Sequence, residues 1–220
     1  MYKIKNYRHI RVIVAGMLIL LPVIFAACYY DYGMAVKDYD VVATFYDHTY
    51  NFSGKNTYSI APKVGHIVEG GEIDTTQKTY DKYIIDQIKV NMETMGYTEI
   101  KDPTVTQPDY VIMVLATQIT NYVAYQSYPW WGGWGGYYGG YWGYYPWYPV
   151  STVYSYSVGT VLINILDPKL ADNTEKKIPV IWVAGINGLL DDTSINIRQR
   201  LLTNISQAFE QSPYLEVPIE

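Results

Sequence analysis

Cys28 is the residue of this chain whose type and position point most directly to a chemical modification. It is the single thiol among 220 residues. It directly follows an apolar run, residues 12–27, that only Gly16 and Pro22 interrupt. The residues before this run carry four positive charges and no negative charge. A basic segment, a short apolar segment and small residues, in this order, are typical of a cleavable export signal, and the run is shorter than the roughly 20 residues of a membrane-spanning helix.

The stretch Ile24-Phe25-Ala26-Ala27-Cys28 resembles the lipobox of bacterial lipoproteins. The resemblance implies that the leader is cut before Cys28 and that the sulfur carries a diacylglyceryl group, with a further acyl chain such as palmitate on the new amino terminus. Several acyl chains hold a protein firmly to a membrane, whereas one chain gives marginal binding. The alternative for a lone cysteine is a buried place in the core. Its position directly after the apolar run favours lipidation.

Tyr29 follows Cys28 at the position where lipoproteins of the inner membrane carry aspartate. The resemblance therefore implies the outer membrane. We expect the protein to be anchored by lipid on the periplasmic face, with the cell surface as the alternative.

The charge of the cleaved chain excludes one class of partner. The leader carries four of the 16 basic residues and none of the 21 acidic ones, so its removal leaves a net charge of −9. Nucleic-acid binding depends on neutralising phosphates, and we expect no nucleic-acid partner. With Cys28 acylated no disulfide can form, and the fold depends on the core of a single domain.

The remaining ionisable residues give no recognisable active site. Asp47 and His48 are adjacent on an expected strand, where neighbouring side chains point to opposite faces. Glu69 and Glu72 fit a solvated turn, and Asp191-Asp192 fits a helix cap. The chain has no G-x-S-x-G, P-loop or H-E-x-x-H motif. We predict no catalytic residue, no metal ligand and no cofactor, with a hydrolase of unrecognised type as the alternative.

Residues 128–149 are all Tyr, Trp, Gly or Pro, and we call them the aromatic segment. Five of the six tryptophans of the chain lie here, and no charge interrupts them. Glycine at this density is expected to deny the segment regular secondary structure, because ordering glycine costs backbone entropy. The rings that could contact a partner belong to Trp130, Trp131, Trp134, Tyr137, Tyr138, Tyr141, Trp142, Tyr144, Tyr145, Trp147 and Tyr148.

Three interpretations of the aromatic segment stay open. Tyr and Trp need apolar cover on one side and a polar partner on the other. The rings could fold back on the parent domain, as in an Ω-loop. They could instead contact a membrane or a protein partner, as at interfacial belts and binding hot spots. The third interpretation is stacking on glycan or peptidoglycan, which the lack of Asp, Asn and Arg in the segment weakens.

Hydrophobic periodicity predicts two helices and six strands. Apolar residues at three- and four-residue steps mark one helix over residues 76–95 and another that ends near Glu210. This order predicts an α+β fold with a mostly antiparallel sheet, two amphipathic helices packed on one face, and a long aromatic and glycine-rich hairpin loop. A β-hairpin is expected to join the first two strands, and a loop is expected over residues 64–76. The strands are expected at residues 39–52, 57–60, 97–100, 110–125, 150–166 and 178–186.

The expected organisation is a signal peptide, a tether, one domain that contains the aromatic segment, and a short tail. Their limits are residues 1–27, 28–38, 39–212 and 213–220.

Four motifs of the expected domain carry a family resemblance. In order they are Lys55-Asn56-Thr57-Tyr58, Gly96-Tyr97, Pro108-Asp109 and Ile181-Trp182-Val183-Ala184-Gly185. With the run that leads to Asp167, they make about residues 38–211 resemble DUF4136, an uncharacterised domain of bacterial lipoproteins that often follows a lipobox. The resemblance implies an envelope location and a single domain, and it brings no catalytic residue.

The leading hypothesis is therefore a non-enzymatic, lipid-anchored envelope protein. Its aromatic segment would contact an envelope protein partner or the membrane. The alternative is a module that binds glycan or peptidoglycan by aromatic stacking.

Overall fold

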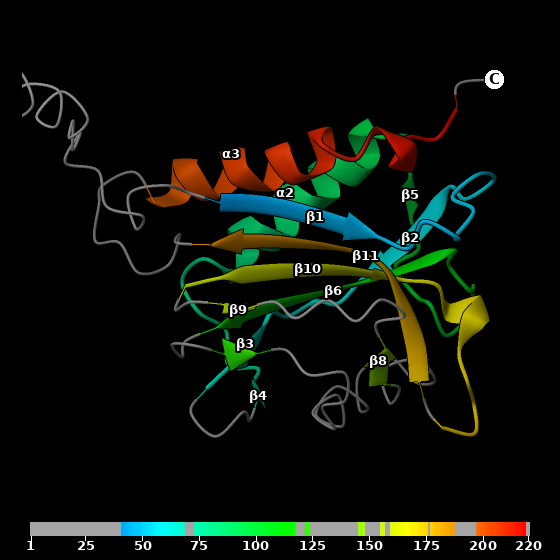
Figure 1. Ribbon diagram of the computed structural model, residues 1–220, viewed down its shortest axis with the longest axis horizontal. Coiled ribbons are helices and arrows are strands. Elements are labelled where there is room, and N and C mark those ends of the chain that lie inside the picture. Colours follow the sequence, from blue (N-terminus) through cyan, green and yellow to red (C-terminus); the bar gives the residue numbers. More distant parts are fainter. Residues whose placement is uncertain are drawn as a thin grey trace, which may run out of the picture. The chain divides into compact units, whose positions relative to one another are not determined.

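The computed structural model describes residues 41–68, 73–117, 122–123, 145–147, 155–156, 159–175, 177–187 and 197–218. Its elements, labelled as in Figure 1, alternate short and long strands with two α-helices and two short 3₁₀ helices. They are β1 (Val41–Tyr46), β2 (Thr57–Ile60), β3 (Gly65–Ile67), β4 (Ile73–Asp74), α2 (Asp81–Thr94), β5 (Thr98–Glu99), β6 (Tyr110–Thr117), β7 (Tyr122–Val123), β8 (Tyr145–Trp147), β9 (Ser155–Tyr156), β10 (Val161–Leu166), η3 (Pro168–Leu170), β11 (Lys177–Asn187), α3 (Ile197–Glu210) and η4 (Pro213–Leu215).

Nine of the described strands form one sheet, in which the long strands run antiparallel. The path through it is β1-β11-β10-β6-β2-β5, and β10 pairs antiparallel with both β11 and β6. Short strands make the parallel pairs: β2 with β5 and β6, β3 with β6, and β8 with β11. Both helices lie on one face of the sheet (Figure 1). The predicted α+β fold, with a mostly antiparallel sheet and its helices on one face, is confirmed.

The two central strands are buried on both faces. All eight residues of β6 and all six of β10 are buried, as their apolar, β-branched sequences require. Their register runs from Val161 opposite Ala116 to Leu166 opposite Val111. Two of the strands expected from the sequence, at residues 110–125 and 150–166, are therefore neighbours in the sheet over β6 and β10. A separate two-stranded ladder of β7 and β9 joins the same two stretches of chain beyond β6 and β10.

The predicted hairpin between the first two strands is wrong. β1 lies at the edge of the described sheet and pairs with β11, whereas β2 is separated from β1 by three strands and pairs in parallel with β6. The connecting residues 47–56 can reach up to about 35 Å, which is enough to cross the end of the sheet. Asp109 fixes the far end of this connection by accepting the backbone N–H groups of Asn56 and Thr57.

The loop expected over residues 64–76 contains two short strands. β3 pairs with the C-terminal part of β6, and β4 pairs with β3. Strands of two or three residues leave no periodicity in a sequence. Their positions follow from the neighbouring long strand.

The helix expected from residue 76 begins at Asp81 because two aspartates turn the chain before it. Asp74 accepts the backbone N–H of Thr76 at 2.8 Å, and Asp81 accepts the backbone N–H of Lys78 at 2.8 Å. From there the apolar stripe of α2 packs inward as predicted, and its buried apolar residues are Ile84, Ile85, Ile88 and Met92.

Trp182 of β11 is the largest fully buried side chain of the described core. Its ring lies 5.4 Å from the ring of Phe209 on α3, measured between centroids. Its Nε1 donates to the Oγ of Ser212 at 2.9 Å, and that hydroxyl donates to the carbonyl of Ala208 at 3.1 Å. The indole is thus satisfied on both its apolar and its polar side.

The segment expected as a tail is packed against the end of α2. Leu215 is 1% exposed, and its carbonyl accepts the hydroxyl of Tyr97 at 2.6 Å. The backbone N–H of Val217 donates to the carbonyl of Met95 at 2.9 Å. Gly96 turns the chain with a φ of 92°, and a Cβ at this position would lie 3.0 Å from the Cβ of Val217. This close approach is a reason for glycine after α2.

The sheet face opposite the helices is also apolar. Leu115, Leu162 and Val183 lie on it, and each is 5% exposed or less. An antiparallel sheet with helices on one face commonly leaves the other face polar and in water. Here the centre of that face is withdrawn from solvent, whereas Phe45 of the edge strand β1, which lies opposite Val183, is 40% exposed.

Candidate functional site

Asp109 holds the chain in front of β2 at the end of the sheet where β6 begins. Its Oδ2 accepts the N–H of Asn56 at 3.1 Å, the N–H of Thr57 at 3.2 Å and the hydroxyl of Thr57 at 2.8 Å. Lys169 donates to its Oδ1 at 2.7 Å. Burial raises the pKa of Asp109, but the hydrogen bonds from Lys169, Asn56 and Thr57 outweigh burial and lower the pKa to about 2. The carboxylate is therefore ionised at neutral pH, with both oxygens engaged.

Asp167 forms a second centre at the same end, directly after β10. Its Oδ2 accepts the hydroxyl of Tyr50 at 2.6 Å and the Nζ of Lys55 at 3.2 Å. Its Oδ1 accepts the backbone N–H of Lys169 at 2.8 Å and so caps η3. Burial and then the hydrogen bond to Asp167 raise the pKa of Tyr50 above its ordinary value. The phenol stays protonated.

These contacts join motifs that are distant in the sequence. Thr57 and Asp109 are 52 residues apart, and Lys55 and Asp167 are 112 residues apart. We call Tyr50, Lys55, Thr57, Asp109, Asp167 and Lys169 the two-aspartate cluster. Its donors and acceptors satisfy one another, so the cluster acts as a structural tie between three loops. Nothing in the sequence around these motifs indicates that they meet.

A buried side-chain contact joins β3 to the start of α2. The Nε2 of His66 lies 3.0 Å from Oδ1 and 3.1 Å from Oδ2 of Asp81, and the two side chains are 3% and 4% exposed. The Nδ1 of His66 is buried without a hydrogen-bond partner. This contact was not predicted from the sequence, because its two residues belong to different elements. The pair explains why the short strand β3 stays docked beside the helix.

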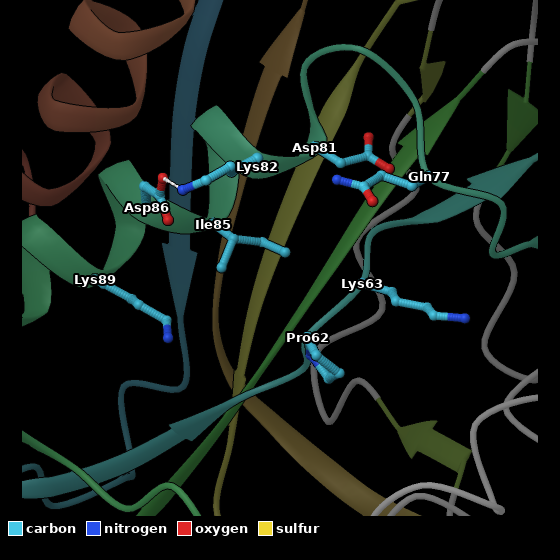
Figure 2. A pocket seen from close by; sticks show the side chains of 8 residues that line it. All are labelled: Pro62, Lys63, Gln77, Asp81, Lys82, Ile85, Asp86 and Lys89. Carbon is cyan, nitrogen blue, oxygen red and sulfur yellow. Dashed lines mark hydrogen bonds and ion pairs between the residues drawn. The ribbon is translucent and has the colours of Figure 1, made fainter.

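A pocket of about 390 Å³ lies beside the first turns of α2 (Figure 2). Lys82 is paired with Asp86, and Lys89 with Glu99 at 2.7 Å. The lining side chains carry charges of both signs, and they include no Ser, Cys or His that could act as a nucleophile. The pocket could bind a small polar molecule, but its lining has no pair of groups for catalysis. It is lined by Pro62, Lys63, Gln77, Asp81, Lys82, Ile85, Asp86 and Lys89.

The structure places the first pair of candidate residues, Asp47 and His48, in a turn after β1. Asp47 accepts the N–H and the hydroxyl of Thr49 at 2.8 and 2.7 Å. His48 packs edge-on against the ring of Tyr46, with centroids 4.3 Å apart. Each therefore has a local structural role, and the two do not converge on a shared site.

Most of the other candidate positions lie outside the described residues. These positions are Cys28, Glu69, Glu72, Asp191, Asp192 and, in the aromatic segment, Trp130, Trp131, Trp134, Tyr137, Tyr138, Tyr141, Trp142, Tyr144 and Tyr148.

The structure describes one part of the aromatic segment, residues 145–147, and this part has regular secondary structure, contrary to the expectation. Tyr145, Pro146 and Trp147 form β8, which runs parallel to Lys177–Pro179 of β11. The prediction that the segment has no regular secondary structure is wrong here. The glycines of the segment end at Gly143, so these residues do not carry the entropy cost on which the prediction rested.

The described part of the chain has neither a cluster of metal-ligating side chains nor a helix suited to a membrane span. In that part, no group of three or more His, Cys, Asp or Glu side chains could hold a metal ion. Neither α2 nor α3, the two α-helices it contains, has the length and apolarity to cross a membrane.

Comparisons with known proteins agree on the fold. Residues 42–214 match the family model described as a domain of unknown function, DUF4136. The chain is similar to the crystal structure of a DUF4136 family protein from Bacteroides thetaiotaomicron, with 30% identity and a TM-score of 0.64 over 80% of this chain and 97% of that one. No curated protein matches.

Two more distant likenesses carry no functional argument. The PelC dodecamer from Paraburkholderia phytofirmans shares 9% identity at a TM-score of 0.40, covering 82% of this chain and 100% of that one. A PDZ domain protein from Parabacteroides distasonis shares 14% identity at a TM-score of 0.39, covering 80% of this chain and 36% of that one.

Proposed function

Because the chain belongs to the DUF4136 family, whose function is unknown, we propose a role from its own residues: a non-catalytic protein held by lipid in the bacterial cell envelope. The observation that carries this proposal is the position of Cys28. It directly follows the apolar leader and stands 13 residues before Val41, where β1 begins. A chain of that length reaches at most about 45 Å, so an acylated Cys28 keeps the domain close to the bilayer surface.

The polar groups of the described domain support a non-catalytic role. The two-aspartate cluster is saturated by its own lysines, hydroxyls and backbone N–H groups. The side chains of His66 and Asp81 are 3% and 4% exposed, and of the two only Asp81 lines the pocket beside α2. Catalytic acids and bases need access to a reacting molecule. Within the described ranges, the pocket beside α2 offers such access but lacks a nucleophile.

The second part of the proposal concerns the aromatic segment. Its rings provide a contact surface for an envelope protein or for the membrane, on the periplasmic face of the outer membrane. Tyr and Trp are the residues most enriched at bilayer interfaces and in binding hot spots. The segment offers twelve of them without a charge. A short tether and an uncharged aromatic surface suit a protein that works close to lipid.

Lipidation is tested by mass spectrometry of the amino-terminal peptide from native membranes, with a Cys28→Ser variant alongside. We expect a peptide that begins at acylated Cys28, and we expect the variant to lose both the lipid and the membrane association. Ser53→Ala, in the exposed turn before β2, is the control and leaves both unchanged. A bare thiol or a retained leader in the native protein would overturn the proposal.

The contact role is tested separately by cross-linking in intact envelopes. Replacing Trp130, Trp131 and Trp134 together by serine is expected to abolish cross-links to a partner or to lipid. Val105→Ser is the matched control, because it removes an apolar side chain that is 81% exposed outside the segment. Equal cross-linking by the triple variant and the control would remove the contact role while leaving the lipid anchor in place.

A further inference from the structure

The pocket beside α2 contains a buried acidic group at the start of the helix. The side chain of Asp81 is 4% exposed, and two donors hold its carboxylate: the Nε2 of His66 at 3.0 Å and the backbone N–H of Lys78 at 2.8 Å. A carboxylate has about four acceptor sites, so Asp81 can accept a further hydrogen bond from a molecule in the pocket. Because the carboxylate is largely withdrawn from water, a charged donor binds it most strongly, and an ammonium group is such a donor.

The pocket also contains a lysine whose ammonium group is available to a ligand. Lys82 is paired with Asp86 in an exposed ion pair. Lys89 is paired with Glu99 at 2.7 Å. Lys63, in the chain after β2, is exposed, and within the described ranges its ammonium group has no acidic partner. A negatively charged group of a ligand is therefore best placed beside Lys63.

The apolar part of the lining and the length of the pocket limit the size of the ligand. Asp81, Ile85 and Lys89 follow one another at four-residue steps, so they lie along one side of α2 and span about 12 Å of its axis. Three residues of extended peptide cover about 10 Å. Ile85 and Pro62 provide the apolar lining. The volume of about 390 Å³ is at the small end of pockets that hold small molecules, which leaves room for small side chains only.

The acidic and basic groups stand on different walls of the pocket. Figure 2 shows Gln77 beside Asp81, whereas Pro62 and Lys63 come from the chain after β2 and Lys89 lies two turns farther along α2. An anion alone would lie near the carboxylate of Asp81, and an amine alone would lie near three lysines. A molecule with both charges, held apart, avoids both repulsions. The amide of Gln77 can donate to a peptide bond and accept from one.

We propose that this pocket binds a short peptide of two or three small residues with free amino and carboxyl ends. The ammonium group of the peptide donates to Asp81, and its carboxylate accepts from Lys63. Its small side chains pack on Ile85 and Pro62. The site binds the peptide without cleaving it. The proposal goes beyond the proposed function, because it depends neither on the lipid anchor nor on the aromatic segment.

The test uses trialanine and two capped forms of it, with isotope-labelled full-length protein in a mild detergent. Acetylation removes the ammonium group of the peptide, and amidation removes its carboxylate. The amino end is tested on the peptide because replacing Asp81 would also remove its contact with His66. We expect millimolar trialanine to shift the NMR signals of residues 77–89. The acetylated form should bind at least about tenfold more weakly, since it loses the bond to a buried charge. The amidated form should bind about threefold more weakly, since it loses an exposed partner.

Lys63→Gln tests the carboxyl end, and Lys101→Gln is the matched control, since it makes the same change at an exposed lysine outside the pocket. Lys63→Gln should weaken trialanine binding about threefold and leave binding of the amidated form unchanged, because both changes remove the same contact. Lys101→Gln should alter neither. Three results would each overturn the proposal: no shifts at millimolar trialanine, a capped form that binds as well as trialanine, or equal effects of the two substitutions.

Discussion

Replacing Asp109 by asparagine is expected to lower the free energy of unfolding at pH 7 by about 2 kcal/mol. The pKa of this carboxyl falls from 3.8 in a free side chain to about 2 in the folded protein. One pKa unit corresponds to about 1.4 kcal/mol, so the ionised form stabilises the fold by about 2 kcal/mol. The side chain is only 14% exposed, which limits screening by solvent.

The pH dependence follows from the direction of this shift. Because the pKa of Asp109 is lower in the folded protein, its stabilisation is complete above about pH 4 and is lost as the pH falls towards 2. The asparagine variant has no such titration. The difference in unfolding free energy between wild type and variant should therefore shrink steadily over that range.

Urea unfolding followed by circular dichroism, on the full-length protein in a mild detergent, measures this difference. Asp86→Asn is the matched control, because it removes the same charge from an exposed ion pair on α2 and should cost less than about 1 kcal/mol. The reasoning fails if Asp109→Asn unfolds within about 0.5 kcal/mol of wild type at pH 7. It also fails if the difference persists unchanged at the lowest pH.

Three further substitutions test other parts of the fold by the same measurement. Gly96→Ala should lower the free energy of unfolding by about 1–2 kcal/mol, because alanine is strained at this positive φ and its Cβ would lie close to Val217. An unchanged free energy of unfolding would show that alanine is not strained at this position. His66→Ala should cost about 3 kcal/mol because it leaves the buried carboxylate of Asp81 with only the backbone N–H of Lys78, and adding Asp81→Asn should restore part of the loss. Leu162→Ala should lower the free energy of unfolding by about 2–5 kcal/mol if the sheet face opposite the helices is packed. A loss below about 1 kcal/mol would indicate that this face is open to solvent.

The sequence predicted those helices and strands whose conformation depends mainly on their own residues. The apolar stripe of α2 and the β-branched runs of β6 and β10 needed no long-range information. The partner of β1 could not be found in this way, because two neighbouring strands joined by a short polar connection predicted a hairpin. The contact of Asp109 with Asn56 and Thr57 instead carries the chain to the other side of the sheet.

The contacts of the two-aspartate cluster could not be predicted from the sequence either, because they are also long-range. Tyr50 and Asp167 are 117 residues apart, and their contact exists only because the strands bring the end of β10 beside the turn before β2. A single sequence shows the polar residues but not their partners. The pair of His66 and Asp81 was missed for the same reason, since β3 is too short to be recognised.

The position of β1 at the edge of the sheet has a mechanical consequence. The chain enters the domain at Val41, and β1 is bonded to β11 through six registered residue pairs. A force on the upstream chain along the axis of β1 acts on all six pairs at once, in shear. It does not separate them one after another. The domain should therefore resist such a pull until all six pairs of β1 and β11 separate together.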